Sequence, residues 1–161
     1  MRRVVVTGLG TINPLGNTVE TSWNSLINSK SGISKITKFE VDDYPCKIAG
    51  TIDDSKINDN IVSSRDQRKI DRFITLGLIA ANEAIKDSGF VSVDESSFRY
   101  GVMVGSGIGG LDTIYRNSSI LDNKGIRKIS PFFIPSSLIN LLSGHISIKY
   151  NLKGPNSSPV T

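Results

Sequence analysis

Cysteine and histidine are nearly absent from this sequence, since Cys46 and His145 are the only residues of their kinds among 161. A single cysteine excludes a disulfide within the chain and agrees with a reducing compartment. One histidine without a cysteine cluster is too little for a zinc site, so no metal is expected. No base is available to activate Cys46 or the serines Ser106, Ser157 and Ser158. The residue types alone therefore identify no catalytic residue, and His145, which stands among aliphatic residues, is expected to be a core or interface residue.

Long apolar runs are also missing. No segment approaches the roughly 20 residues needed to span a bilayer, and the stretch Val4–Val6 is too short for the core of a signal peptide. We therefore expect a cytoplasmic protein with no membrane contact. The net charge is +4, but the basic residues are scattered and not interleaved with aromatic residues, so nucleic acid is not an expected partner.

Short apolar runs alternate with amphipathic stretches along the chain. Val4–Val6 and Tyr100–Val104 are predicted to be buried strands that end in glycine turns, and a further strand is expected near Ile48–Ile52. Asn17, with Glu20 as its capping-box partner, is predicted to begin a helix that Gly32 stops. This alternation predicts an α/β layered fold with at least partly parallel strands.

The second half of the chain carries the clearest helical patterns. Ser64 and Gln67 form a capping-box pattern that opens a long amphipathic helix closed by Gly89. A short helix is expected over 111–122, and Ser136 is predicted to cap a last helix. That last helix is apolar over more than one face, so it must be buried within the domain or against another subunit. Its apolar residues are Leu138, Ile139, Leu141, Leu142, Ile146 and Ile148.

The run Gly105–Gly110 fits the G-x-G-x-x-G spacing and follows a predicted strand. In a dinucleotide-binding domain such glycines let a pyrophosphate approach the start of a helix. However, no later strand carries the acidic residue that would bind a ribose. A glycine turn that permits tight backbone packing is the alternative, and it is favoured.

Arg65, Arg68, Lys69 and Arg72 cluster where the long helix is predicted to begin. Cations are unfavourable at a helix N-terminus, so this arrangement indicates a purpose such as contact with an acidic partner. The alternative is an ordinary solvated face, because aspartates are interspersed among these residues.

Several segments, in the same order and at similar separations, resemble signatures of the β-ketoacyl-acyl-carrier-protein synthases of the elongating type II branch. The resemblance covers essentially the whole chain. The matching segments are Arg2–Gly10, Pro14–Asn17, Ser31–Ser34, Gln67–Asp71, Gly105–Leu111, Lys128–Ser136 and Gly154–Thr161.

The resemblance implies the thiolase fold, in which two similar α/β halves each contain a five-stranded sheet. Residues 1–161 would form one incomplete N-terminal thiolase-like domain that ends just before the family's nucleophilic cysteine. The family's reaction is a decarboxylating Claisen condensation of acyl groups with malonyl-acyl carrier protein, and it needs no cofactor. Its cysteine and its two catalytic histidines have no counterpart among these residues, so we expect the isolated chain to be inactive.

The resemblance also assigns residues by position. Ile108 matches a residue that lines the acyl-chain pocket, while Phe133 and Ile134 match residues that reach the partner's pocket across a dimer interface. Arg65, Arg68 and Lys69 match the basic patch that docks acyl carrier protein. The resemblance thus implies a homodimer formed through the 131–149 region.

Pro159 departs from the family pattern, because it falls where a central strand is expected and a proline cannot donate to the ladder. Three hypotheses follow from the sequence. The first is the N-terminal part of a condensing enzyme of bacterial fatty-acid synthesis. The second is a non-catalytic module for carrier-protein binding or dimerisation. The third is a nucleotide-binding α/β domain that uses Gly105–Gly110.

Overall fold

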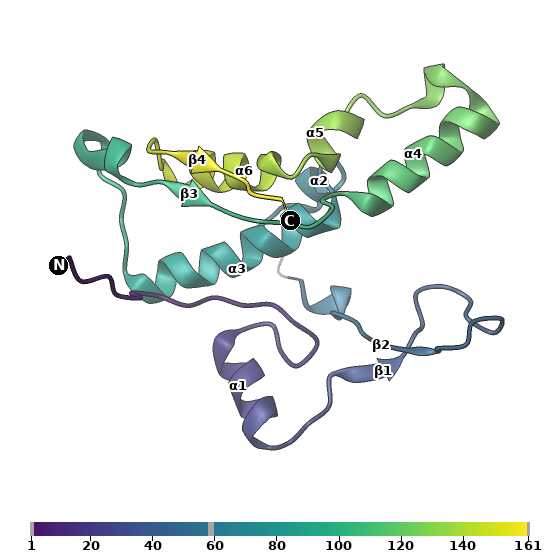
Figure 1. Ribbon diagram of the computed structural model, residues 1–161, viewed down its shortest axis with the longest axis horizontal. Helices are drawn as coiled ribbons and strands as arrows, with labels where there is room; N and C mark the ends of the chain where they lie inside the picture. The colour runs from purple at the N-terminus through teal and green to yellow at the C-terminus, as the bar shows by residue number, and fades with distance from the viewer. Residues whose placement is uncertain (1, 58–59, 161) are drawn as a thin grey trace. The chain divides into compact units, whose positions relative to one another are not determined.

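The computed structural model describes residues 2–57 and 60–160, in which short strands alternate with helices (Figure 1). The helices are α1 (Val19–Ile27), α2 (Ser64–Gln67), α3 (Arg72–Ser88), α4 (Leu111–Lys124), α5 (Phe133–Ser137) and α6 (Asn140–Tyr150). The strands are β1 (Ile33–Lys35), β2 (Ile48–Gly50), β3 (Val102–Met103) and β4 (Asn156–Ser157). Short 3-10 helices occur at Asp54–Lys56, Asp94–Arg99 and Ile126–Lys128. Within the described ranges, no helix is both long and apolar enough to cross a bilayer.

The chain divides into two compact units. The first unit contains Met1–Asn58 and Ile79–Gly89, and the second contains Asp59–Leu78 and Phe90–Thr161. The start of α3 therefore belongs to the second unit and the rest of this helix to the first. As predicted, α3 is closed by a glycine, Gly89, whose φ of +63° lies in the left-handed region that residues with side chains rarely adopt.

In the first unit, the strand predicted at Val4–Val6 is wrong. These valines join no strand in the described chain, and they are 92%, 64% and 78% exposed. The residues that follow are bound to α3 instead: the Leu9 amide donates to Asp87 at 2.8 Å, and the Thr11 amide donates to Glu83 at 2.9 Å. An apolar run becomes a buried strand only where neighbouring strands supply its hydrogen bonds. Here the carboxylates of α3 bind amides that follow the run, and no strand of the described chain pairs with the valines themselves.

The first helix begins one residue later than predicted. Thr18 is its N-cap instead of Asn17, and the capping box closes with Thr21 instead of Glu20. The Thr18 hydroxyl accepts from the Thr21 amide at 3.1 Å, and the Thr21 hydroxyl accepts from the Thr18 amide at 3.1 Å. Glu83 of α3 adds a further cap by accepting from the amide of the first helical residue at 2.8 Å. A threonine pair thus does what the sequence pattern assigned to an Asn–Glu pair.

Gly32 does not stop α1, which ends earlier, at Ile27. A Cβ atom at Gly32 would lie 2.9 Å from the Cβ of Pro14, so this glycine serves close packing just before β1. β1 pairs antiparallel with β2, and Ile33 lies opposite Gly50. The strand expected near residues 48–52 is confirmed as β2. The sequence analysis missed β1, since only three residues form it and all are exposed.

The long helix predicted to run from Ser64 to Gly89 is instead two helices. α2 is a single turn whose N-cap is Ser63: the Ser63 hydroxyl accepts from the Asp66 amide at 3.1 Å. The chain then turns, and α3 starts at Arg72. The carboxylate of the preceding residue, Asp71, caps this helix by accepting from the Phe73 amide at 3.1 Å. Arg65, Arg68 and Lys69 therefore do not oppose the dipole of the long helix, and that part of the prediction is wrong.

The strand predicted over Tyr100–Val104 is confirmed as the shorter β3. It pairs in parallel with β4, with Val102 opposite Asn156, which agrees with the partly parallel pairing expected. β4 ends at Ser157, so Pro159 lies beyond it, and no ladder hydrogen bond is lost there in the part of the chain that the structure describes. The conflict expected at this proline is therefore not observed.

The last helix begins later than predicted. Ser136 lies buried inside α5 and does not cap α6, because its hydroxyl donates to the Phe133 carbonyl at 3.0 Å. α6 itself starts at Asn140, after an extended residue at 138. The helix predicted over 111–122 is confirmed as α4, which runs slightly longer.

Packing in the second unit centres on α6. Leu142 and Ile146 are buried, and a Cβ atom at Gly77 of α3 would lie only 2.5 Å from Leu142 Cδ2, so the two helices are in close contact. Ile148 of α6 is nevertheless 83% exposed. Only one face of this apolar helix is therefore buried in the chain.

Candidate functional site

The basic segment, residues 63–72, comprises α2 and the turn into α3. Arg65 and Arg68 are exposed, whereas Lys69 forms an ion pair of 3.0 Å with Asp66. The Ser63 hydroxyl, also bonded to Asp66 at 2.8 Å, and the Lys69 ammonium hold the pKa of this carboxyl below its ordinary value of 3.8. The segment thus offers two exposed guanidinium groups beside one cation that already has an acidic partner.

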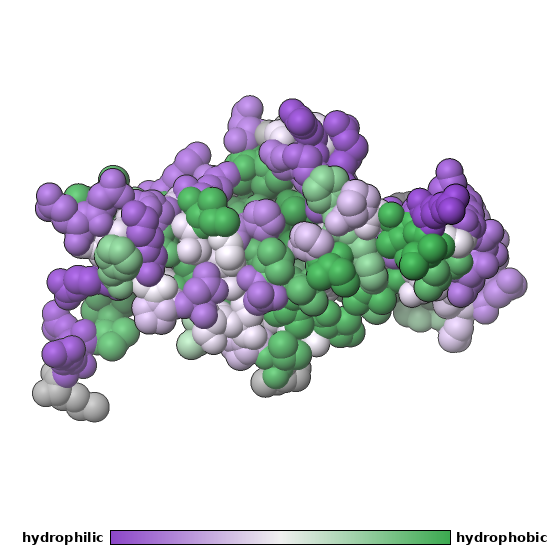
Figure 2. Space-filling model, turned by 90° about the horizontal axis from the view of Figure 1, so that it is seen from above, coloured by the Kyte–Doolittle hydropathy of each residue, from purple (hydrophilic) through white to green (hydrophobic). Residues whose placement is uncertain are grey.

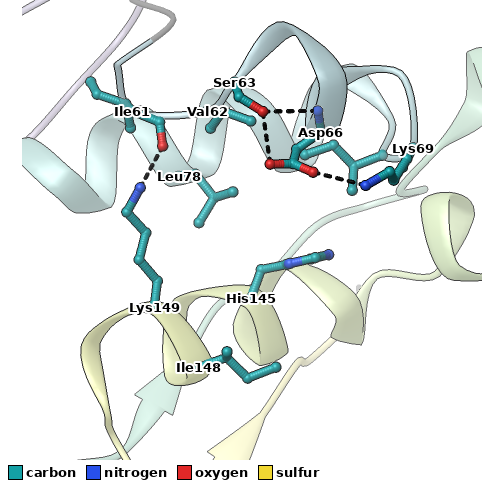
Figure 3. A pocket seen from close by; sticks show the side chains of 10 residues that line it. Ile61, Val62, Ser63, Asp66, Lys69, Leu78, His145, Ile148 and Lys149 are labelled. Carbon is teal, nitrogen blue, oxygen red and sulfur yellow. Dashed lines mark hydrogen bonds and ion pairs between the residues drawn. The ribbon is translucent and has the colours of Figure 1, made fainter.

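A pocket of about 420 Å³ lies between the basic segment and α6, entirely within the second unit (Figure 3). Figure 3 shows Ser63, Asp66 and Lys69 on one side and His145 on the other. Lys149 of α6 reaches across and donates to the carbonyl oxygen of Ile61. The full lining is Ile61, Val62, Ser63, Asp66, Lys69, Ile70, Leu78, His145, Ile148 and Lys149.

His145 is half-buried in this lining. Burial lowers the pKa of its imidazole from the ordinary value of 6.5, and the negative charge of Asp66 partly opposes this shift. The prediction that His145 is a core or interface residue thus fits its aliphatic neighbours, but the structure places the ring at a pocket that also contains charged groups.

Asp71 is a buried carboxylate that connects two helices. It is 7% exposed, and besides the amide of Phe73 in α3 it accepts from Thr113 in α4. The Thr113 hydroxyl donates to Asp71 Oδ2 at 2.6 Å, and the Thr113 amide donates to the same oxygen at 3.1 Å. A carboxylate is favourable at a helix N-terminus, where free amides and the helix dipole attract negative charge. Asp71 occupies this position at both helices.

The glycine loop, Gly105–Gly110, packs against the end of α5. The Gly110 amide donates to the Ser137 carbonyl at 3.0 Å, and a Cβ atom at Gly109, whose φ is +80°, would lie 2.7 Å from the same oxygen. Close backbone packing therefore accounts for these glycines. A phosphate bound at the start of α4 would need the amide that Asp71 already engages, which weighs against the nucleotide-binding hypothesis.

The residues predicted to line the acyl-chain pocket lie on neighbouring segments. Ile108, in the glycine loop, is 61% exposed; in α5, Phe133 is half-buried and Ile134 is 55% exposed. Figure 2 views the side on which Figure 1 shows α4, α5 and α6, and apolar surface covers the middle of that face. Contact between the glycine loop and α5 brings the segments that carry these residues together. Their role in acyl binding stays a prediction.

The other candidate nucleophiles have structural partners. Cys46 is exposed and its thiol contacts the Ile48 carbonyl at 3.3 Å. The Ser106 hydroxyl accepts from the Gly109 amide at 3.1 Å, and the Ser158 hydroxyl shares a hydrogen bond of 2.7 Å with Ser143. Among the described residues, no three side chains of the metal-binding types gather into a cluster.

Asp71 and the pocket are the features that the sequence analysis missed. Asp71 stands among cations in the sequence, yet an aspartate directly before a helix is a recognisable N-cap. Its bond to Thr113 spans 42 positions and leaves no local pattern. The pocket likewise depends on contact between the basic segment and α6, which are distant in the sequence.

The second unit thus combines two parallel strands, a glycine loop packed against a short helix, and a basic segment beside a pocket. The sequence profile of the family described as "Beta-ketoacyl synthase, N-terminal domain" matches residues 1–161. The chain therefore belongs to the β-ketoacyl synthase family, as the resemblance indicated.

The relatives in this family include proteins named 3-oxoacyl-acyl-carrier-protein synthase 2. The protein from Vibrio harveyi is 46% identical over 155 residues, which cover 96% of this chain and 37% of the relative. The protein from Rhizobium meliloti is 46% identical over 168 residues, covering 100% of this chain and 40% of the relative. The chain thus spans less than half the length of these relatives.

Solved structures agree on the fold. A ketosynthase/chain length factor for ishigamide matches with a TM-score of 0.84 at 23% identity, over 99% of this chain and 40% of that one. A type II polyketide synthase acyl carrier protein in complex with its ketosynthase bound to the hexaketide matches with a TM-score of 0.68 at 26% identity, over 95% of this chain and 40% of that one. The chain therefore has the fold of the N-terminal half of a ketosynthase, and the predicted fold class is confirmed.

Proposed function

We propose that this chain is the N-terminal part of an enzyme that elongates acyl chains by decarboxylating condensation with malonyl-acyl carrier protein. The observation that carries the proposal is the family match over residues 1–161, together with the 46% identity to 3-oxoacyl-acyl-carrier-protein synthase 2. We further propose that residues 1–161 form one incomplete thiolase-like domain, of a protein that works in the cytoplasm.

In this proposal the chain contributes binding surfaces and the rest of the enzyme contributes the catalyst. Arg65, Arg68 and Lys69 dock the acidic carrier protein, and Ile108 lines the acyl pocket. Phe133 and Ile134 line the pocket of the partner subunit in a homodimer. The family's nucleophilic cysteine and paired histidines would attack the thioester and stabilise the enolate that forms when carbon dioxide leaves. His145 matches a structural position of the family.

The exposure of the guanidinium groups supports the docking assignment. Arg65 and Arg68 lie at the surface of α2, and Lys69 is held nearby by its ion pair with Asp66. Arginine is well suited to this task because its planar guanidinium can bind a carboxylate with two parallel hydrogen bonds. Binding through such contacts should weaken as salt concentration rises.

Calorimetric titration of the chain with acyl carrier protein at low salt tests the docking assignment. Arg68→Glu should weaken binding about tenfold or more, which corresponds to about 1.4 kcal/mol. Arg127→Glu is the matched control, because it makes the same charge change at an exposed arginine outside the basic segment. Equal losses for the two variants would show a non-specific charge effect, and absence of binding by the unaltered chain would refute the assignment.

The second candidate function is a non-catalytic module for carrier-protein binding or dimerisation. It rests on the resemblance, which gives none of residues 1–161 the role of the family's cysteine or catalytic histidines. We expect purified chain to form no condensation product from dodecanoyl- and malonyl-loaded carrier protein, as measured by mass spectrometry of the acyl groups. Turnover by the chain alone would overturn this expectation.

A further inference from the structure

The Asp71 carboxylate holds the first turns of both α3 and α4. One oxygen accepts from the amide of Phe73, and the other accepts both the amide and the hydroxyl of Thr113. A buried carboxylate with charge-assisted hydrogen bonds is costly to disturb, since losing a partner leaves a desolvated polar group. The relative position of these two helix starts therefore depends on this side chain.

Gly110 shows how tightly the contact is fitted. A Cβ atom there would lie 3.1 Å from Asp71 Oδ2 and 2.7 Å from the Cα of Ser137. Gly110, the last residue of the glycine loop, thus lies buried between Asp71 and the end of α5. Any shift of Asp71 would be transmitted to this loop, because close-packed neighbours leave no free volume to absorb it.

Asp71 lies between two segments to which the proposed function assigns roles, the basic segment and the glycine loop. Arg68 and Lys69 stand three and two residues before it, and its hydrogen bonds to Thr113 hold the start of α4, which follows the loop that carries Ile108. We infer that Asp71 is a positioning residue that couples carrier-protein docking on the basic segment to the placement of the glycine loop. This inference rests on the proposed function, because it assumes that the basic segment binds carrier protein.

The physical basis of the coupling is a change in local opening. Docking restrains residues 63–72, so Asp71 is released from Thr113 less often, and the start of α4 opens less frequently. The opposite must also hold: a ligand that orders the glycine loop would strengthen carrier binding by the same factor.

Hydrogen–deuterium exchange of the chain, with and without dodecanoyl-loaded acyl carrier protein, tests the inference. In the unaltered chain, the carrier should slow exchange about threefold or more both at residues 63–72 and at residues 106–114. In Asp71→Asn the amide group cannot accept from every donor that the carboxylate serves. Binding should stay within about twofold, with protection at 63–72 retained and protection at 106–114 lost.

Three control variants separate positioning from general destabilisation. We call the carrier-induced slowing of exchange at residues 106–114 transmission. Thr113→Ser keeps the hydroxyl and should show the same transmission as the unaltered chain, whereas Thr113→Val removes the hydroxyl and should show less. Ser143→Ala removes a different buried hydrogen bond of the same unit, to Ser158, and should leave transmission intact. If Asp71→Asn does not fold, the comparison of Thr113→Ser with Thr113→Val still tests the inference.

The outcomes distinguish the inference from the function on which it rests. Protection at 63–72 alone in the unaltered chain, or undiminished transmission in both Asp71→Asn and Thr113→Val, overturns the inference while carrier binding stands. Absence of protection at both segments overturns the proposed docking function, and the inference falls with it. Transmission that is lost in Asp71→Asn and Thr113→Val but kept in Thr113→Ser and Ser143→Ala supports it.

Discussion

Two glycines with positive φ stand in different surroundings, and they allow backbone strain to be separated from packing. Gly109 (φ +80°) would place a Cβ atom 2.7 Å from the Ser137 carbonyl, whereas Gly89 (φ +63°) has nothing within 4 Å. Gly89→Ala should cost about 1 kcal/mol of unfolding free energy from strain alone. Gly109→Ala should cost about 3 kcal/mol, since a steric clash is added. Urea denaturation measures both, and equal costs would contradict the close packing of the glycine loop.

His145 predicts a pH dependence of stability near neutrality. Burial lowers the pKa of the folded imidazole below 6.5, so the unfolded chain binds the proton more tightly. Stability should therefore decrease as pH falls through 6.5 toward the lower folded pKa. Asp66 and Asp94, whose pKa values are also lowered, lose their contributions only around and below 3.8. The midpoint temperature of thermal unfolding should thus fall as the pH is lowered from about 8 to 5, and His145→Gln should remove this fall. If the fall persists in His145→Gln, other groups cause it.

At the level of single residues, the sequence predicts which chemical groups are present or scarce, but it does not predict which side chains are in contact. The scarcity of cysteine and histidine, and the cations at residues 65–72, could be stated directly. The double role of Asp71 could not, because its bond to Thr113 depends on how two distant helices meet. The ion pair between Lys69 and Asp66 is local, but Asp66 has several cations near it in the sequence, so the sequence does not tell which of them pairs with it.

Among the elements, α6 contains both a buried and an exposed aliphatic residue, which gives a matched comparison. Leu142 is 5% exposed and contacts Gly77, while Ile148 is 83% exposed. Leu142→Ala should lower the free energy of unfolding by about 2–5 kcal/mol, because it leaves a cavity between α3 and α6. Ile148→Ala should change it by less than about 0.5 kcal/mol. Chemical denaturation of both variants checks this, and a large loss for Ile148→Ala would indicate that this face is covered.

Element boundaries show where local patterns stop being sufficient. The pattern predicted α4 and β3 well, since each is bounded by glycine or by a change of periodicity. It joined α2 to α3 because Ser64 and Gln67 fit a capping box just before apolar residues that recur at helical spacing. The break is made by Asp71, which caps the second helix. The pattern also assigned Val4–Val6 to a strand, although a strand requires partners that the described chain does not provide.

For the molecule as a whole, exposed apolar surface is the property that most needs explanation. Phe132, Ile134 and Leu138 are 43%, 55% and 45% exposed, and they fall within the 131–149 region that the resemblance assigns to a dimer interface. Contiguous exposed apolar surface commonly marks an interaction site. A second copy of the chain would cover such a surface with the same residues in an isologous interface. Dimerisation is therefore the expectation to test.

Sedimentation velocity over a range of concentrations tests dimerisation through the 131–149 region. Ile134→Glu places a charge in the proposed interface and should raise the dimer dissociation constant at least about tenfold, because the carboxylate would have to be desolvated. Ile126→Glu is the matched control, since Ile126 is 75% exposed but lies outside the region. Its dissociation constant should match that of the unaltered chain. If both variants dimerise equally well, another surface forms the dimer. If the unaltered chain stays monomeric at every concentration, the exposed apolar residues of α5 are not sufficient for self-association.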